Sequence, residues 1–505
     1  MNSDQFKALE AFSSLRLQRL QNFLQSNQIV KSWERFTATM AARQETAPHK
    51  QRDTRVLQVN ASKIGQFVFE NSQQSFLGDW HIKLSEDNSD AANLQEAASR
   101  LRDSDMPVAF PTETVYGLGA DATRSAAVRG IYSAKGRPSD NPLIVHISSL
   151  SQLRRLLVPK NGLSPDLKSA PDPIPPIYEP LISRFWPGPL TILLPLPTPS
   201  LLAPEVTASL PTVAVRMPSS TLALALIHLA DVPIAAPSAN ASSKPSPTTA
   251  AHVLHDLAGR IDLILDGGPC NVGVESTVVD GLTNPPVILR PGGVSIDMLR
   301  SFPGWEDVQV AYEDGAETGA PRAPGMKYKH YSPNARVLLF HGQMDGVSAK
   351  RYLGKGKSVG VLTTRTWQEG FLQSGSQIPG NPPISNMNGH VPNGDAKVHQ
   401  LRENADPELE IVEVTPSLTP IAIPSAQHSQ VRLSDQDDQD TTEIWTIGLG
   451  QNTANIARGL FSALRELDQK GVDIIFVEGI DDGEGGAAAA VMNRLRKAAE
   501  AEIIL

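Results

Sequence analysis

Apolar residues along the first half of the chain alternate between short strand-like runs and segments with helical spacing. In residues 91–102, for example, alanines and leucines recur three to four positions apart, which is typical of an amphipathic helix. The predicted strands are 107–110, 143–146, 191–194, 212–216, 234–236, 261–266, 276–280 and 286–289, and the predicted helices include 124–135 and 221–229. This alternation predicts a mixed α/β domain.

A second stretch with strand and helix signals begins near residue 336. Its predicted strands are 337–340, 358–363, 444–447 and 474–478, and its predicted helices are 455–470 and 487–501. Strands that alternate with helices favour a small parallel sheet with helices on its faces.

The remaining segments lack both periodicities. Residues 305–335 read as a connector, 159–180 as an irregular proline-rich loop, and 367–442 as a disordered insertion, since compact domains rarely contain so long a polar loop. We therefore predict an N-terminal extension (1–53), a first domain (54–304), a connector (305–335) and a second domain (336–505).

Length, charge and cysteine content narrow the class of protein. A chain of 505 residues is too long for a single hydrophobic core of ordinary size and predicts two or three domains. Its net charge of −9 and lack of a dense Lys/Arg run argue against stable tRNA binding. A single cysteine, Cys270, excludes an internal disulfide and a cysteine-based zinc cluster. No apolar run approaches about 18 residues, so no membrane span is predicted.

We expect a cytoplasmic protein. The alternative is a mitochondrial pool, because residues 6–23 have amphipathic character. Asp4 and Glu10 count against it, since transit peptides are poor in acidic residues. The N-terminal extension is therefore read as disordered or as a targeting segment.

Most of the candidate chemistry lies in residues 110–146, FPTETVYGLGADATRSAAVRGIYSAKGRPSDNPLIVH. Thr112 and Thr114 place hydroxyls on a turn after a predicted strand. Lys135 and Arg137 flank a glycine, and lysine with arginine supplies a point charge and a planar fork for a polyphosphate. A solvated basic turn is the alternative for these residues alone.

Further polar groups follow other predicted strands. Ser238 and Asn240 lie in a PSAN turn after an apolar strand, Ser276 follows a glycine-rich loop, and Arg290 ends a strand. Each alone commonly serves a turn or a cap. Arg216, which closes an apolar strand, needs an anionic or carbonyl partner, either a substrate carboxylate or an internal Asp or Glu. Neither a complete P-loop nor a metal-binding signature is present, so no metal ligands are assigned.

These motifs together resemble the threonylcarbamoyl-AMP synthase family. Residues 108–293 are similar to its YrdC-type domain, and 455–499 fit the extra C-terminal domain of its long form. The bridging segment 323–335, APGMKYKHYSPNA, is specific to that long form. The resemblance implies a YrdC-type twisted open α/β sheet with a concave, positively charged cavity, plus a smaller Rossmann-like parallel α/β domain.

The resemblance also implies an enzyme activity, that of a nucleotidyltransferase. L-threonine, bicarbonate and ATP, with Mg²⁺, would give threonylcarbamoyl-AMP and pyrophosphate. A separate complex would then transfer the threonylcarbamoyl group to the adenosine beside the anticodon of tRNA.

Site residues are implied position by position. Lys135 and Arg137 would be catalytic by stabilising charge. The ATP contacts would be Lys135, Arg137, Ser139, Thr212, Ser238, Asn240, Ser246, Arg290 and Tyr328. The threonine contacts would be Thr112, His146, Arg216, Ala236 and Ser276. The segment with Lys327, Tyr328, His330 and Tyr331 matches a lid. No general base is evident; His146 is the only candidate, and for it a role in orienting the ligand is favoured.

Three other functions compete with this interpretation. A concave basic surface on this fold could hold double-stranded RNA in a translation-associated module, but the acidic net charge and the lid-like connector count against it. Carbamoyl transfer in hydrogenase maturation brings zinc-binding cysteines, which a single cysteine cannot supply. An inactive homologue is disfavoured by the intact set of polar motif residues.

Overall fold

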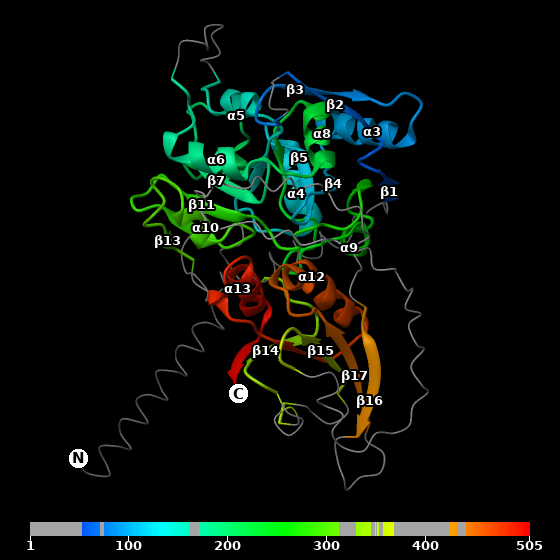
Figure 1. Ribbon diagram of the computed structural model, residues 1–505. Coiled ribbons are helices and arrows are strands. Elements are labelled where there is room, and N and C mark those ends of the chain that lie inside the picture. The colour runs from blue at the N-terminus through cyan, green and yellow to red at the C-terminus, as the bar shows by residue number, and fades with distance from the viewer. Residues whose placement is uncertain are drawn as a thin grey trace, which may run out of the picture. The chain divides into compact units, whose positions relative to one another are not determined.

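The structure is a computed structural model of the 505-residue chain (Figure 1). It describes residues 53–505 except 71–74, 161–170, 313–329, 345–348, 350, 353–356, 368–424 and 433–440. The predictions for residues 1–52, for Tyr328 and for most of the 367–442 insertion fall outside the described residues.

The first domain contains an 11-stranded sheet in the order β1-β10-β4-β5-β9-β6-β8-β7-β11-β12-β13. Its strands are β1 (Arg55–Gln58), β4 (Val108–Pro111), β5 (Tyr116–Asp121), β6 (Ile144–His146), β7 (Leu190–Pro195), β8 (Thr212–Arg216), β9 (Ile234–Ala235), β10 (Leu263–Asp266), β11 (Thr277–Asp280), β12 (Val287–Arg290) and β13 (Gln309–Val310). The sheet mixes parallel and antiparallel pairs, and β2 (Gly65–Phe69) and β3 (Trp80–Leu84) form a separate antiparallel hairpin.

Helices connect and cover these strands. They are α3 (Ser89–Asp103), α4 (Ser125–Lys135), α5 (Leu150–Leu156), α6 (Glu179–Phe185), α7 (Pro204–Thr207), α8 (Thr221–Ala230), α9 (Ala250–Leu257) and α10 (Ile296–Arg300). Helix α3 buries the predicted alanine and leucine face. Helix α9 begins after Thr249, whose hydroxyl accepts a hydrogen bond from the backbone N–H of His252.

Strand β5 was missed by the sequence patterns because its glycines read as a loop. Gly117 and Gly119 instead let β5 pass close to the Phe110 ring on β4. A Cβ at Gly119 would lie 2.6 Å from Phe110 and 2.8 Å from Ile234, whereas one at Gly117 would have ordinary contacts of 3.4 Å or more. The sheet also continues to β13, beyond residue 304.

The second domain holds a six-stranded sheet in the order β16-β17-β15-β18-β14-β19. Its strands are β14 (Arg336–His341), β15 (Val359–Thr363), β16 (Gln427–Arg432), β17 (Thr441–Gly448), β18 (Ile474–Glu478) and β19 (Ala501–Ile504). All neighbouring pairs are parallel except β16 with β17, which confirms the predicted parallel sheet. The helices are α12 (Thr453–Gln469) and α13 (Ala488–Ala498), and the latter is shorter than predicted because β19 begins at residue 501.

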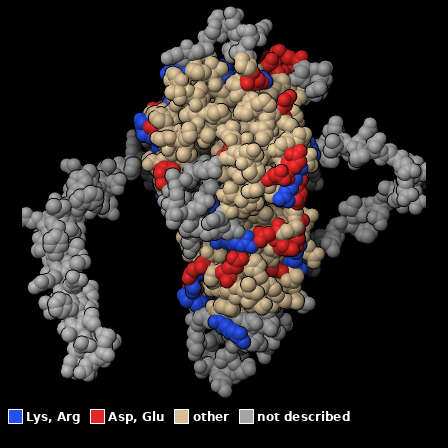
Figure 2. Space-filling view, turned by 90° about the vertical axis from the view of Figure 1, so that its left-hand side faces the viewer, with Lys and Arg blue, Asp and Glu red and all other residues tan. Residues whose placement is uncertain are grey.

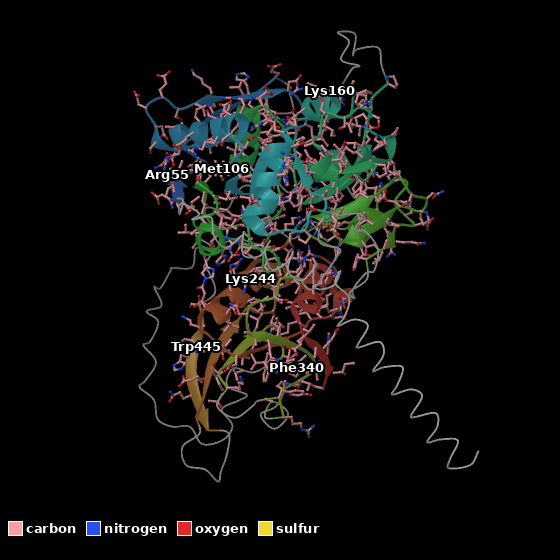
Figure 3. All side chains as sticks on the ribbon, turned by 180° about the vertical axis from the view of Figure 1, so that it is seen from behind. Arg55, Met106, Lys160, Lys244, Phe340 and Trp445 are labelled. Atoms are coloured by element: carbon pink, nitrogen blue, oxygen red, sulfur yellow. The ribbon has the colours of Figure 1, made fainter. Side chains whose placement is uncertain are left out.

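One apolar cluster joins the two domains. Val115 and Val274 of the first domain pack in the same cluster as Ile456 and Leu460 of α12. At the border between the domains, the Lys244 ammonium donates to the side chain of Asn334 (Figure 3). The end of the first domain that carries Val115 is therefore covered by the second.

The close approach at β5 generates a stability prediction. We expect Gly119→Ala to lower the free energy of unfolding by about 1–3 kcal/mol, because the added methyl group overlaps the Phe110 and Ile234 side chains. Gly117→Ala is the matched control, with a smaller loss. Denaturant unfolding measures the stability of both variants. Equal losses would show that the close contact at Gly119 is not what makes an added methyl group destabilising there.

Candidate active site

Polar residues at the ends of several strands meet at one place in the first domain. His146 and Arg216 are the last residues of β6 and β8 and lie opposite each other in the parallel register. Thr112 follows β4, Ser276 precedes β11, and Arg290 ends β12. The sheet thus gathers side chains that are far apart in the sequence.

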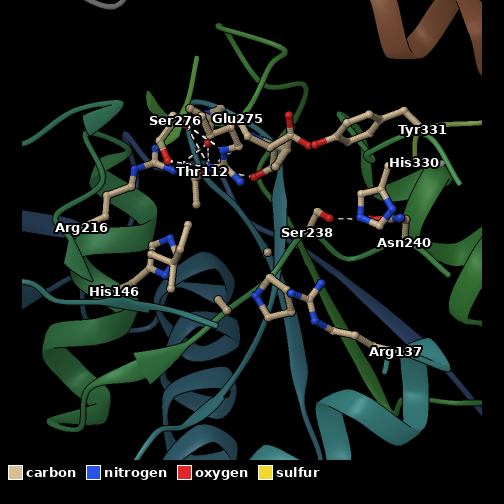
Figure 4. Close-up of a pocket in the computed structure, with 17 residues that line it drawn as sticks. Thr112, Arg137, His146, Arg216, Ser238, Asn240, Glu275, Ser276, His330 and Tyr331 are labelled. Carbon is tan, nitrogen blue, oxygen red and sulfur yellow. Dashed lines mark hydrogen bonds between the residues drawn. The ribbon is translucent and has the colours of Figure 1, made fainter. Parts of the chain in front are cut away.

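These side chains line one pocket (Figure 4). His146, Arg216 and Thr112 lie on one side of it, and Ser238, Asn240 and Arg137 lie on the other. The full lining is Thr112, Thr114, Val115, Gly117, Arg137, Ile144, His146, Arg216, Ala236, Pro237, Ser238, Asn240, Glu275, Ser276, Arg290, His330 and Tyr331. Every residue assigned to threonine from the sequence is among them.

Arg216 is buried and is held by hydrogen bonds to two neighbouring segments. Its Nε donates to the Gly188 carbonyl at 3.1 Å, and Nη1 donates to the Thr114 hydroxyl at 2.8 Å. Nη2 lies 2.5 Å from Oε1 of buried Glu113, but the orientation of the two groups gives no hydrogen bond. The internal acid considered as an alternative partner is therefore present, and it pairs with Arg216 through Nη2.

His146 is neutral at physiological pH. Burial and the nearby charge of Arg216 lower its pKa to about 3. Its Nδ1 is buried and has no hydrogen-bond partner among the described residues. A neutral imidazole with one unpaired nitrogen fits the predicted role of orienting a polar ligand rather than carrying a charge.

The opposite side of the pocket is built around the Ser238–Asn240 turn. The Ser238 hydroxyl donates to the Asn240 side-chain oxygen at 2.6 Å. Lys135, in the last turn of α4, donates to the backbone carbonyls of Ser238 and, at 2.6 Å, Asn240. Arg137, just after the left-handed Gly136, donates to the Asn141 and Pro142 carbonyls at 3.3 and 2.9 Å.

Burial removes these cations from water and so disfavours their charged forms. It lowers the pKa of Lys135 well below its usual value, and burial with partial compensation from Tyr132 leaves the pKa of Arg137 at about 10. Arg290 is also buried, and desolvation lowers its pKa to about 10. Its Nη2 donates to the Ser276 carbonyl at 2.9 Å and to the Ser276 hydroxyl at 3.1 Å.

Some residues assigned from the sequence lie away from the pocket lining. Lys135 lies behind the Ser238–Asn240 turn, and Ser139 is exposed in the loop after α4. Thr212 begins β8, at the opposite end of that strand from Arg216. Ser246 is buried behind the pocket wall, where its hydroxyl donates to Glu275 at 2.5 Å.

Sequence patterns gave no role to the acidic residues Glu113 and Glu275. Burial by itself would raise the pKa of Glu275, but the charges of Arg494 and Arg290 outweigh it and lower the pKa to about 2. Glu275 is therefore ionised and balances part of the positive charge. The only signal in the sequence is its position one residue before Ser276.

His330 and Tyr331 of the connector lie over the pocket, as Figure 4 shows. Burial together with the charges of Arg137 and Lys135 lowers the pKa of His330 to about 4. With these two residues in place the cavity volume is about 60 Å³. Pockets for drug-sized ligands are commonly about 300–1,000 Å³, so the cavity under this cover is small.

Comparisons with known proteins match both domains. A family model for Sua5, YciO and YrdC proteins, described as "Telomere recombination", covers residues 100–292. A second, described as "Threonylcarbamoyl-AMP synthase, C-terminal domain", covers residues 294–500. The threonylcarbamoyl-AMP synthase of Schizosaccharomyces pombe is 43% identical over 80% of this chain and 88% of its own length. The chain belongs to the threonylcarbamoyl-AMP synthase family.

Other relatives agree with this assignment. The Pyrococcus abyssi enzyme of the same name is 40% identical over 81% of this chain and 95% of its own. The crystal structure of P. abyssi Sua5 complexed with L-threonine has a TM-score of 0.60 at 33% identity, over 90% of this chain and all of that one. The predicted family, α/β fold and class of enzyme are confirmed.

On the face in Figure 2, basic and acidic side chains of the described residues are interspersed. Within the described part of the chain, none of the helices has the length and apolar character needed to cross a bilayer.

Buried histidines generate a prediction of pH-dependent stability. Burial lowers the pKa of His146 and His252 to about 3 and of His330 to about 4. Each is neutral when folded and titrates near 6.5 when unfolded. The free energy of unfolding that these neutral histidines contribute is present in full above pH 6.5. It is lost as pH falls, by about 1.4 kcal/mol per histidine and pH unit.

We therefore expect the melting temperature to fall between pH 7.5 and pH 5, before most carboxylates titrate. His252, outside the pocket, offers the test, because its Nδ1 accepts the Thr248 N–H at 3.3 Å and a glutamine can replace it. Calorimetry of His252→Gln should show a shallower pH dependence than the wild type. An unchanged slope would contradict the assignment of a neutral, buried His252.

Proposed function

We propose that this chain synthesises L-threonylcarbamoyl-AMP from L-threonine, bicarbonate and ATP and releases pyrophosphate. The supporting observation is the grouping of Arg137, Arg216 and Arg290 around one pocket that also presents the hydroxyls of Thr112 and Ser276. Three guanidinium groups in so small a space call for anionic ligands.

The two sides of the pocket suit the two ends of the reaction. On one side, Nη2 of Arg216 would bind the threonine carboxylate, with Thr112, Ser276 and the unpaired nitrogen of His146 in reach of the remaining polar groups. Ala236 supplies an apolar contact at the end of β9. This arrangement would fix the amine with a defined orientation toward the centre of the pocket.

The nucleotide side would hold the phosphates. The Ser238 hydroxyl, the Asn240 amide and Arg137 lie on that side. Arg290 also lines the pocket. Lys135 would act from behind, through the carbonyls that it holds and through its charge. Ser139, Thr212 and Ser246 remain proposed ATP contacts that require a shift in the loops around the pocket. Tyr328 also remains a proposed ATP contact.

The chemistry follows from this layout. The threonine amine attacks bicarbonate, and loss of water leaves a carbamate. A carbamate oxygen then attacks the α-phosphorus of ATP, a new P–O bond forms, and the bond to pyrophosphate breaks. Negative charge grows on the phosphoryl oxygens and on the leaving group, where Arg137 and Arg290 with Lys135 behind them stabilise it electrostatically.

Magnesium would enter with ATP as part of the substrate. Glu275 is the only carboxylate among the lining residues, and both its oxygens already accept hydrogen bonds from Ser246 and Arg494. The protein thus offers few direct ligands, and the phosphates and water would complete the coordination. His330 and Tyr331 would then close over the labile carbamate and adenylate.

We place the enzyme in the cytoplasm, with a separate transferase complex taking the product to tRNA. The family assignment and the small pocket disfavour the double-stranded RNA-binding alternative.

Pyrophosphate release tests the proposal directly. We expect release only when ATP with Mg²⁺, bicarbonate and L-threonine are all present. Arg216→Gln should raise the KM for threonine and Arg137→Gln the KM for ATP, each by about 10- to 100-fold, because each change removes a charge-assisted hydrogen bond.

The exposed Arg129→Gln is the matched control, since Arg129 pairs only with Glu205 among the described residues and lies outside the pocket. It should behave as the wild type. Threonine-independent release, or no release from folded protein, would exclude the synthase function.

A further inference from the structure

A fully buried arginine of the second domain reaches the wall of the pocket in the first. Arg494, on α13, has a side chain that is 0% exposed. Its Nε donates to Oε2 of Glu275 at 3.0 Å, and Nη1 donates to the backbone carbonyl of Pro291. Glu275 lines the pocket, whereas Arg494 does not.

The two residues that Arg494 holds lie next to two substrate residues. Glu275 precedes Ser276, and Pro291 follows Arg290. The segments are closely packed, because a Cβ added at Gly292 would lie 2.1 Å from the Thr277 nitrogen. One guanidinium therefore fixes both segments at the point where Arg290 donates to Ser276.

Arg494 also acts on the connector residue that covers the pocket. Its guanidinium carbon lies 5.9 Å from the centre of the Tyr331 ring, and that ring packs against Phe461 of α12 at a centroid distance of 5.1 Å. The Tyr331 hydroxyl points toward the Glu275 carboxylate (Figure 4). Burial and that carboxylate raise the pKa of Tyr331 to about 12, so the phenol stays protonated.

We propose that Arg494 is a positioning residue for the synthase reaction, through which the second domain sets the Glu275 carboxylate and, with it, Ser276, Arg290 and the Tyr331 cover. This inference rests on the proposed synthase function. It assigns the second domain a direct part in the geometry of the pocket rather than attachment alone.

A second interdomain ion pair offers a matched control. Arg465 of α12 donates to Asp256 at 3.0 and 2.8 Å and to the Pro245 carbonyl, and both charged side chains are 4% exposed. It is as buried as Arg494 and also crosses between the domains. Neither Asp256 nor Pro245 lines the pocket, and the Arg465 pair does not contact the Glu275 and Pro291 segments that Arg494 holds.

The test compares Arg494→Gln, Arg494→Lys and Arg465→Gln in the full chain. Pyrophosphate release is measured well below each variant's melting temperature. Arg494→Gln should lower kcat/KM for threonine and for ATP by about 10- to 100-fold, the effect of a misplaced binding group. Arg494→Lys keeps the charge beside Glu275 and should recover part of that loss. Arg465→Gln should lower the melting temperature but keep kinetic constants close to those of the wild type.

A kinetic double-mutant cycle with Glu275→Gln shows whether Arg494 acts through that carboxylate. The loss from Arg494→Gln should shrink in the Glu275→Gln background. Additive losses, or equal kinetic constants for Arg494→Gln and Arg465→Gln, would overturn the proposal.

Two further results are separable from these. If Arg494→Gln does not fold, the kinetic constants of Arg494→Lys decide whether Arg494 is a positioning residue. The ammonium of Arg494→Lys cannot occupy the positions of both Nε and Nη1 of the planar guanidinium, so kcat/KM should still fall relative to Arg465→Lys, and equal values would overturn the proposal. A wild-type protein without threonine-dependent release would instead refute the synthase function itself.

Discussion

The structure depends on holding several positive charges inside one small pocket before any anion binds. An uncompensated buried charge is strongly unfavourable, and like charges in one cavity add to that cost. In this fold, backbone carbonyls accept hydrogen bonds from these cations and reduce the cost of burying them. Lys135 takes those of Ser238 and Asn240, Arg137 those of Asn141 and Pro142, and Arg290 that of Ser276. Turns at strand ends supply these carbonyls, so the arrangement of the sheet and the chemistry of the site are linked.

Two carboxylates of the first domain complete this charge balance, and the cations that pair with them come from different domains. Glu113 lies beside Arg216 within the first domain. Glu275 is held by Arg494 from the second domain, which keeps it ionised despite burial. The first domain alone would therefore leave Glu275 without its closest cation. This dependence gives a physical reason for a second domain that contributes no lining residue among those described.

Local patterns predicted much of the fold. Helix α3 and strand β8 were found because periodicity is set by near neighbours along the chain. Strand β5 was missed, because Gly117 and Gly119 look like loop residues until the Phe110 ring is seen against them. The pocket residues Thr112, His146, Arg216 and Ser276 were anticipated from the family resemblance. The role of Arg494 was not predicted, because its partner Glu275 is 219 residues away and no local sequence pattern indicates that the two residues pair.

A crystal structure of the protein with L-threonine and a non-hydrolysable ATP analogue with Mg²⁺ tests the central claim most directly. We expect the threonine carboxylate on Arg216, the phosphates between Arg137, Arg290 and the Ser238–Asn240 turn, and Arg494 still on Glu275. Ligands bound elsewhere, or a pocket closed by Glu113 on Arg216 with threonine excluded, would contradict it.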